Sequence, residues 1–441
     1  MVARVQLISH ASVVIEAGGA RILTDPWWSG RCFNDSWQLL MPAAVIDDML
    51  ETIDWLWLSH EHPDHFHIAT LRGLPDAFKR RVTVLFQQSS DSEKMVAALT
   101  RLGFANIRLM PNRRWLRLDD DLEVMCWQSR QIDSALAVRG GGTTIVNLND
   151  CDFTARDLIE LHAATGPVDI LFNQFSLAGF DGFEATLPAT AARVLDAMVH
   201  ASRVLEARTT VPFASFAAFC RADNAHINAA ANTPAMVAER FAREGLPLAV
   251  LLPGEWVSAG AAHDSRAAID RYAELFATAA ASPGEPGEVI GRDAIEAAFA
   301  TMATMLHRQH GPALRLLLRA VHVDVPDLGI RLTLDFARRR IGETSAPADL
   351  AIASQPLHFM LAQPFGMQTL GVSGRYRLLG GNRNWMMHRA LFAMLNAGLG
   401  LAPARLVDRR QLGFLYRRRG DLLRQVAHTT RRSLAAMQVE R

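Results

Sequence analysis

Four histidines, an aspartate and a proline crowd into one short segment of the sequence, WLWLSHEHPDHFH, which covers residues 55–67. Within this segment His60, His62, Asp64 and His65 form the pattern H-x-H-x-D-H directly behind an apolar run. Imidazole nitrogens and carboxylate oxygens are ligands of zinc, iron and manganese. The pattern therefore predicts a metal site, and metal-dependent chemistry, at this point of the chain.

The spacing within the pattern indicates how the chain would hold metal. In an extended segment the side chains at positions i and i+2 point the same way, so His60 and His62 can bind one ion together. Pro63 then favours a turn, which lets Asp64 and His65 face a second position.

The elements that must position these residues follow an α/β pattern. Short apolar strands alternate with amphipathic helices to about residue 260. We expect a metal-binding domain over residues 1–265, a Pro- and Gly-rich linker over 266–291, a smaller α+β domain over 292–384, and an Arg-rich helical tail over 385–441.

Composition limits the classes of function. The chain has 441 residues, half of them apolar, with 46 basic and 45 acidic side chains, and this balance argues against nucleic-acid binding by bulk charge. It has no apolar run of about eighteen residues, so no transmembrane helix is expected. The N-terminus does not resemble a signal peptide. The four cysteines of the chain are scattered, which suits a reducing compartment. We therefore expect a cytoplasmic protein.

The pattern H-x-H-x-D-H resembles the signature of the metallo-β-lactamase superfamily. The segment SHASVVIEAGGARILTDPWWSG resembles the opening of the branch with L-ascorbate-6-phosphate lactonase and N-acyl-phosphatidylethanolamine phospholipase D. ILTDPWWSG, LSHEHPDHF, IVNLNDCDF, VPFASFAAF and NTPAMVAERF resemble the metallo-β-lactamase-like part of CMP-N-acetylneuraminate hydroxylase. The resemblance covers residues 5–255 and implies an αββα sandwich, ahead of the smaller domain and the tail.

The resemblance also implies roles for residues outside the pattern. In this fold one metal site takes the first two histidines and a third from a later strand. The other takes the Asp and His of the pattern and a C-terminal histidine, and an aspartate bridges the two. Asp150 matches the bridging aspartate, with Asp152 as its neighbouring competitor, and His226 matches the last histidine.

The third histidine of the first site is missing. The segment CWQSRQID, residues 126–133, covers its expected position and places Gln128, Ser129 or Gln131 there, with Asp133 close by. A serine or an amide is a poor zinc ligand. Either Asp133 or a water completes the first site, or only the second site is filled. A carboxylate would favour iron, because oxygen ligands suit the harder ion.

Two further residues end strands that converge near the metals in this branch. His10 is expected to touch substrate or hold a ligand, and Asp25 to accept a hydrogen bond from a ligating imidazole. We place Asp133 in the same supporting role as Asp25. Asp64 and His10 are the predicted catalytic residues, with Asp64 serving as both metal ligand and proton acceptor.

The expected function is metal-dependent hydrolysis. A bound divalent ion lowers the pKa of its water from about 15.7 to about 7, and the metal-bound hydroxide attacks an ester, a lactone or a phosphodiester. One or two zinc ions are expected, with iron or manganese as alternatives. The substrate is expected to be a small molecule, and phosphorylated, sugar-like and lipid-like molecules are the candidate classes.

The alternative is a non-haem iron oxygenase component like CMP-N-acetylneuraminate hydroxylase. Such an enzyme needs electrons from a Rieske cluster, which requires paired Cys and His motifs. The chain has no C-x-H motif, so a separate Rieske or reductase protein would supply the electrons.

The C-terminal part carries two weak patterns. Its strands faintly resemble sterol-carrier-like domains, although a scaffold or dimerisation domain is favoured. The tail could lie on an anionic membrane surface, but a solvated helix with an apolar docking face is favoured. No oligomeric state is predicted.

Overall fold

The computed structural model divides into two compact units. The first is formed by residues 1–286 with 372–374, and the second by residues 287–371 with 375–441. The structure describes the following residues: 2–89, 92–129, 133–380, 383–409 and 411–412.

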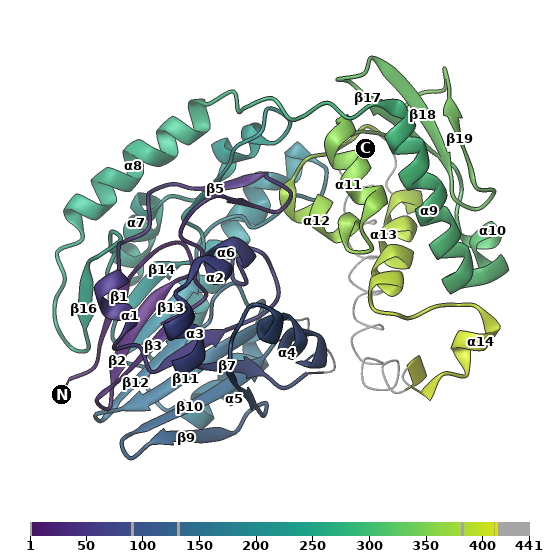
Figure 1. The fold of residues 1–441 in the computed structure, drawn as a ribbon. Coiled ribbons are helices and arrows are strands. Elements are labelled where there is room, and N and C mark those ends of the chain that lie inside the picture. The colour runs from purple at the N-terminus through teal and green to yellow at the C-terminus, as the bar shows by residue number, and fades with distance from the viewer. Residues whose placement is uncertain (1, 90–91, 130–132, 381–382, 410, 413–441) are drawn as a thin grey trace. The chain divides into compact units, whose positions relative to one another are not determined.

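Two large sheets form the centre of the first unit (Figure 1). One has seven strands, in the order β16 (Trp256–Ser258), β1 (Arg4–Leu7), β2 (Val13–Ala17), β3 (Ala20–Thr24), β6 (Trp55–Leu58), β7 (Thr83–Gln87) and β8 (Asn106–Met110). The other has six, in the order β14 (Thr210–Phe213), β13 (Ile170–Gln174), β12 (Thr143–Asn147), β11 (Ser134–Gly140), β10 (Leu122–Gln128) and β9 (Trp115–Asp119). A small third sheet joins β15 (Ala217–Phe219), β5 (Trp37–Leu39) and β4 (Arg31–Cys32).

The two large sheets pack face to face. One apolar cluster contains inward side chains of both sheets, such as Val5 and Ile15 from the first and Val124 and Leu136 from the second. Successive residues of a strand point to opposite faces. Accordingly Trp57 of β6 lies in this central cluster, whereas its neighbours in the strand lie in the cluster on the outer face.

Helices cover the outer face of each sheet. On the seven-stranded sheet they are α1 (Asp47–Leu50), α2 (Ile68–Gly73), α3 (Asp76–Arg81) and α4 (Ser92–Arg101). On the six-stranded sheet they are α5 (Ala155–Thr165) and α6 (Leu187–Val204). The layers are therefore helix, sheet, sheet and helix, and the predicted αββα sandwich is confirmed.

The segment predicted as a linker, 266–291, is different in the structure. Its first part forms a 16-residue helix, α8 (Arg266–Ala281), which follows α7 (Pro234–Glu244). Tyr272 and Phe276 of α8 are buried in the central cluster of the first unit. The boundary between the two units falls at Pro286–Gly287.

The second unit contains a five-stranded sheet in the order β19 (Arg340–Glu343), β18 (Ile330–Asp335), β17 (Val321–Val325), β20 (Leu350–Ala351) and β21 (Arg377–Leu378). Its helices are α9 (Arg292–His310), α10 (Leu314–Leu317), α11 (Ser354–Ala362), most of α12 (Gly366–Ser373), α13 (Arg383–Asn396) and α14 (Pro403–Leu406). The predicted tail begins within α13, and its residues 413–441 lie outside the described part of the chain.

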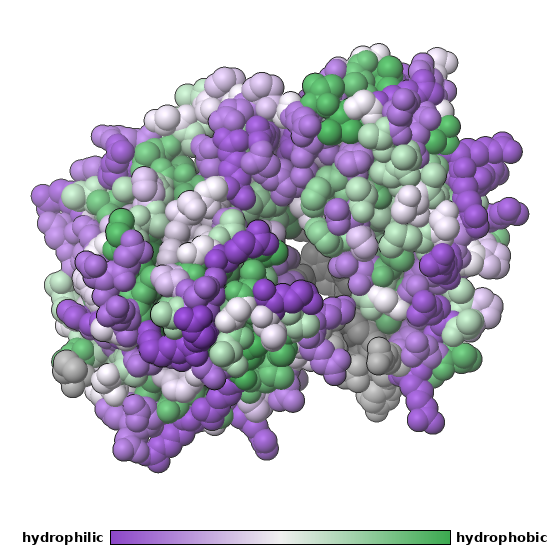
Figure 2. Space-filling view, viewed as in Figure 1, coloured by the Kyte–Doolittle hydropathy of each residue, from purple (hydrophilic) through white to green (hydrophobic). Residues whose placement is uncertain are grey.

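The described surface mixes polar and apolar residues. On the face seen in Figure 2, hydrophilic and hydrophobic residues are interspersed. No helix in the described part of the chain is long and apolar enough to cross a membrane.

Candidate metal centre

Seven side chains with metal-ligating atoms gather in two adjacent groups. The first ligand set consists of His60, His62, Asp133 and Asp150. The second ligand set consists of His10, Asp64 and His65. Within each set one ligand atom per residue lies within 4.8 Å of every other.

Strand ends bring these residues together. The H-x-H-x-D-H pattern follows β6, and His10 lies in the connection between β1 and β2. Asp133 precedes β11, and Asp150 follows β12, so the second large sheet contributes one carboxylate from each of these connections. Side chains at strand ends converge here because both sheets present their connecting loops at one edge, where α/β proteins commonly bind ligands.

In the first ligand set the ring of His60 lies centrally. Its Nε2 is 2.9 Å from His62 Nδ1, 3.5 Å from Asp133 Oδ1 and 3.8 Å from Asp150 Oδ2. The set therefore offers two imidazoles and two carboxylates around one point.

In the second ligand set Asp64 lies between two imidazoles. Its Oδ2 is 3.4 Å from His10 Nε2 and 3.4 Å from His65 Nε2. The Nε2 atom of His65 is also 3.7 Å from Oδ1 of Asp150, whose Oδ2 faces the first set. Asp150 thus has the position of a carboxylate shared by both sets.

The donor atoms fit a pair of metal ions. Among the described residues, His10 Nε2, Asp64 Oδ1, His65 Nε2 and Asp150 Oδ1 are buried without a hydrogen-bond partner. Buried polar atoms are normally satisfied, so four unsatisfied ligand atoms at one place are unusual. Metal ions bound between these atoms would satisfy them.

Asp25 forms hydrogen bonds with a ligand and with residues next to the ligands. Its Oδ1 accepts the backbone N–H of Ser59 at 2.8 Å, and its Oδ2 lies 2.8 Å from His65 Nδ1 and 3.1 Å from Asn149 Nδ2, which donates to it. Asp25 and Asn149 both have positive φ angles, of 32° and 50°. Non-glycine residues rarely adopt such angles, and they cluster where function requires a fixed geometry.

Burial and charge shift the acidities of the ligands in opposite directions. Burial alone would lower the pKa of His65, but the carboxylates of Asp64 and Asp150 outweigh it and raise that pKa well above its usual value. Burial alone would raise the pKa of Asp64, but His65 and His10 hold it well below its usual range. For His60 burial dominates and keeps the pKa well below normal, which favours the neutral, ligating form.

Asp133 behaves differently from Asp64. Burial and the nearby charge of Asp150 raise the pKa of Asp133 well above its usual value. A divalent ion would reverse this shift, because it stabilises the carboxylate form. Metal binding to the first ligand set is therefore expected to release a proton from the protein.

The structure corrects the predicted role of His226. This residue lies in the 3-10 helix Ala225–Ala230 and is exposed, with its Nε2 4.0 Å from Glu184 Oε1. It belongs to neither ligand set, because the helix turns it toward Glu184 rather than toward the strand ends. His10, predicted as a catalytic residue or ligand holder, occupies the second set instead.

The structure also shows which residues lie where the third histidine was expected. Ser129 Oγ lies 3.4 Å from Asp133 Oδ2, and the amide of Gln128 donates to the carbonyl of Gln88. Gln131 lies outside the described residues. Asp133, predicted either to complete the first site or to support the ligands, belongs to the first ligand set, and it is the sole acidic residue between Glu123 and Asp150.

Aromatic side chains shield the centre. Trp27 and Trp37 are buried, with ring centroids 5.4 Å and 6.3 Å from that of His10. The ring centroids of Phe33 and His62 lie 6.0 Å apart. Phe33 also begins a left-handed turn over residues 33–35, whose φ angles are 51°, 59° and 61°. Trp27, Trp37 and Phe33 therefore line the side of the centre formed by His10 and His62.

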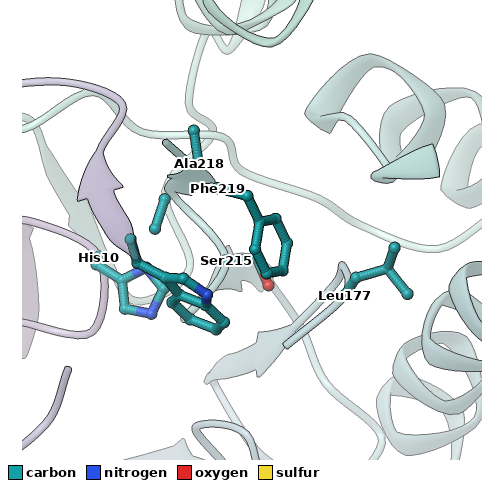
Figure 3. A pocket seen from close by; sticks show the side chains of 7 residues that line it. His10, Leu177, Ser215, Ala218 and Phe219 are labelled. Atoms are coloured by element: carbon teal, nitrogen blue, oxygen red, sulfur yellow. The ribbon is translucent and has the colours of Figure 1, made fainter. Parts of the chain in front are cut away.

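A small cavity lies beside His10 (Figure 3). Its volume is about 10 Å³, enough for about one water molecule. Apart from His10 and Ser215 its walls are apolar, formed by Trp37, Leu177, Ala217, Ala218 and Phe219. The segment FASFAAF, residues 213–219, therefore borders the second ligand set at His10.

Comparisons with known proteins agree with this geometry. Residues 4–173 match the family model described as the beta-lactamase superfamily domain. Cytidine monophosphate-N-acetylneuraminic acid hydroxylase of Danio rerio is 30% identical over 186 residues, which cover 41% of this chain and 30% of the relative. The enzyme of Sus scrofa is 28% identical over 149 residues, covering 32% and 34%. The chain thus spans about a third of the length of these curated relatives.

Two solved structures are also similar. The isothiocyanate hydrolase from Delia radicum gut bacteria is 18% identical with a TM-score of 0.45, covering 58% of this chain and 100% of that chain. The diiron β-hydroxylase CmlA from Streptomyces venezuelae is 17% identical with a TM-score of 0.41, covering 58% and 54%.

The family match, the layered fold and the H-x-H-x-D-H pattern identify the class. Residues 4–173 match the model of the beta-lactamase superfamily domain, and the first unit has the metallo-β-lactamase fold. Within that superfamily the chain is similar in sequence to the cytidine monophosphate-N-acetylneuraminic acid hydroxylases. The family and the two ligand sets support a metal-dependent enzyme.

Proposed function

We propose that this chain is a dinuclear non-haem iron hydroxylase. The observation that carries the proposal is Asp133, a carboxylate in the first ligand set where a third imidazole was expected. With Asp150 shared, each set then combines two imidazoles with two carboxylates. Oxygen-rich sets of this kind suit iron or manganese better than zinc, which prefers nitrogen and sulfur.

Hydroxylation requires dioxygen, two electrons and two protons. One oxygen atom of dioxygen enters a C–H bond of the substrate, and the other leaves as water after taking up two electrons and two protons. An iron pair, when bound, supplies the redox capacity for activating dioxygen. Because the sequence has no C-x-H motif for a Rieske cluster, the two electrons come from a separate electron-transfer protein.

The chain's own residues would orient the metals and exclude water. His60, His62, Asp133 and Asp150 would hold one ion, and His10, Asp64, His65 and Asp150 the other. Asp64 offers a buried oxygen without a partner among the described residues, which would bind the second ion. Phe33 and Trp37 cover two of the imidazoles and limit access of bulk water.

The substrate is proposed to be a small phosphorylated or sugar-like molecule. The names of the curated relatives describe hydroxylation of a cytidine monophosphate-linked sugar acid. The similarity covers only part of those enzymes, so the class of substrate, rather than the individual molecule, is carried over.

Hydrolysis is the second candidate, and one observation favours it. The sequence has no C-x-H motif for a Rieske cluster, and hydrolysis needs no electrons. A divalent ion in either set would then activate water, and Asp64 would accept its proton.

Oxygen uptake distinguishes the two candidates. The metal-free chain is loaded with either Fe²⁺ or Zn²⁺, treated with a chemical reductant, and exposed to dioxygen in an oxygen electrode. The hydroxylase proposal predicts rapid uptake by the iron form alone, and much slower uptake by iron-loaded His62→Ala. If iron-loaded protein consumes no more dioxygen than His62→Ala, while the zinc form hydrolyses lactones, esters or phosphodiesters, the second candidate replaces the first.

A further inference from the structure

Ser59 lies between Asp25 and both ligand sets. It follows β6 directly and is fully buried. Its Oγ is 2.7 Å from Asp25 Oδ2, 2.9 Å from His60 Nδ1 and 3.3 Å from His65 Nδ1. His60 belongs to the first set and His65 to the second, so one hydroxyl approaches an imidazole of each.

The directions of these hydrogen bonds follow from the number of protons. A carboxylate offers only acceptors, and a serine hydroxyl has one proton. Ser59 donates that proton to Asp25 Oδ2, so its oxygen can only accept a proton from His60. The ring of His60 therefore carries its proton on Nδ1, which leaves Nε2 bare.

The proton on Nδ1 of His65 is also fixed by Asp25, but by a direct hydrogen bond rather than through Ser59. Its Nδ1 donates directly to Asp25 Oδ2 at 2.8 Å. The Nε2 atoms of both rings face ligand oxygens, 3.5 Å from Asp133 Oδ1 for His60 and 3.4 Å from Asp64 Oδ2 for His65. A ring nitrogen binds metal only without its proton, and the hydrogen bond at the other nitrogen decides which one is bare.

We propose that Ser59 is a positioning residue that connects Asp25 to His60, so that one buried carboxylate fixes the tautomer of an imidazole in each ligand set. Asp25 acts directly on His65 and through Ser59 on His60. The inference rests on the ligand sets used in the proposed function. It is independent of the reaction, and it would hold equally for a hydrolase.

The unsubstituted, metal-free protein provides the first test. Nitrogen-15 NMR of ¹⁵N-histidine-labelled chain distinguishes Nδ1–H from Nε2–H rings, and His60→Gln and His65→Gln assign the two signals. The proposal predicts a proton on Nδ1 at both positions, and an unprotonated Nε2 at His60. A His60 ring that is mainly Nε2–H would overturn it, whatever the enzyme's reaction proves to be.

Two buried serines provide a matched pair of variants. Ser59→Ala removes the connection to His60, so Zn²⁺ affinity of the first set should fall about 10–100-fold. The second set should change far less, because His65 keeps Asp25. The control is Ser134→Ala, which removes a buried hydrogen bond to the Ser59 carbonyl, 2.7 Å long, without touching an imidazole. It should keep both affinities.

Chelator competition measures the two affinities, and the NMR signals of His60 and His65 show which set is filled. Equal losses in Ser59→Ala and Ser134→Ala, or an unchanged His60 tautomer in Ser59→Ala, would reject the positioning role. Circular dichroism checks folding. Should Ser59→Ala not fold, Ser59→Thr retains a hydroxyl and must preserve the His60 tautomer; a shift to Nε2–H in that folded variant would also reject the role.

Discussion

At the scale of single residues, the proposed chemistry depends on one departure from the expected pattern. Asp133 supplies an oxygen where the superfamily pattern expects an imidazole, and Asp150 offers one oxygen to each ligand set. Both carboxylates lie close to His60, so their combined charge favours a cation at this point of the fold.

Asp150 and Asp152 form a test pair two residues apart. Asp150 faces both ligand sets, whereas Asp152 is exposed. Asp150→Ala should therefore lose most of the bound metal from both sets, and Asp152→Ala should keep full metal content. Metal analysis after gel filtration measures both. Equal metal content in the two variants would show that Asp150 is not the shared ligand.

His10 and His226 form a second pair. His10→Ala should lower the metal affinity of the second set by about tenfold or more, because it removes one of two imidazoles. His226→Ala should leave metal binding unchanged, since that ring lies beside Glu184. Isothermal titration of metal-free protein with Zn²⁺ compares them. The reverse result would restore His226 as the ligand.

At the scale of elements, strand ends were predictable and the placement of loops was not. The apolar run of β6 predicted a buried strand, and so placed His60 and His62 at its end. Asp150 was predicted from the resemblance, as the aspartate that follows the apolar run of β12. The prediction of His226 as a ligand failed because the direction of a 3-10 helix depends on packing against distant residues, which local sequence does not encode.

Composition misled the assignment of α8. The Pro- and Gly-rich residues behind the helix suggested a linker, although Tyr272 and Phe276 recur at helical spacing and are buried. Tyr272 stacks on Phe216 with ring centroids 4.5 Å apart, so the helix belongs to the core of the first unit.

A buried histidine of α13 makes the stability of the second unit sensitive to acid. Burial lowers the pKa of His388 to about 4, against a usual value of 6.5. Below pH 6.5 the unfolded chain takes up a proton that the folded chain refuses, so stability falls as the pH drops from 6.5 toward 4. The loss reaches about 3 kcal/mol at pH 4.

Urea unfolding of metal-free protein between pH 6.5 and pH 4 measures this loss. The control variant His388→Gln can still donate to the Asn384 carbonyl but does not titrate. It should lose about 3 kcal/mol less than the parent over the same range. An identical pH dependence in parent and variant would mean that His388 is protonated in the folded state.

At the scale of the whole molecule, the sequence predicted more of the first unit than of the second. A specific pattern, H-x-H-x-D-H, identified the fold, and the family model covers residues 4–173. The second unit has no comparable motif. Its five-stranded sheet is a mixed one formed by short strands, whose order follows from long-range pairing such as that of β17 with β20.

The most direct test of the account is the metal content of the full chain, purified without an affinity tag and measured by mass spectrometry. We predict two iron ions per chain, with clear losses in His62→Ala and Asp64→Ala. Two zinc ions in the native protein would contradict the hydroxylase assignment and favour hydrolysis. Full metal content in both variants would contradict the metal centre itself.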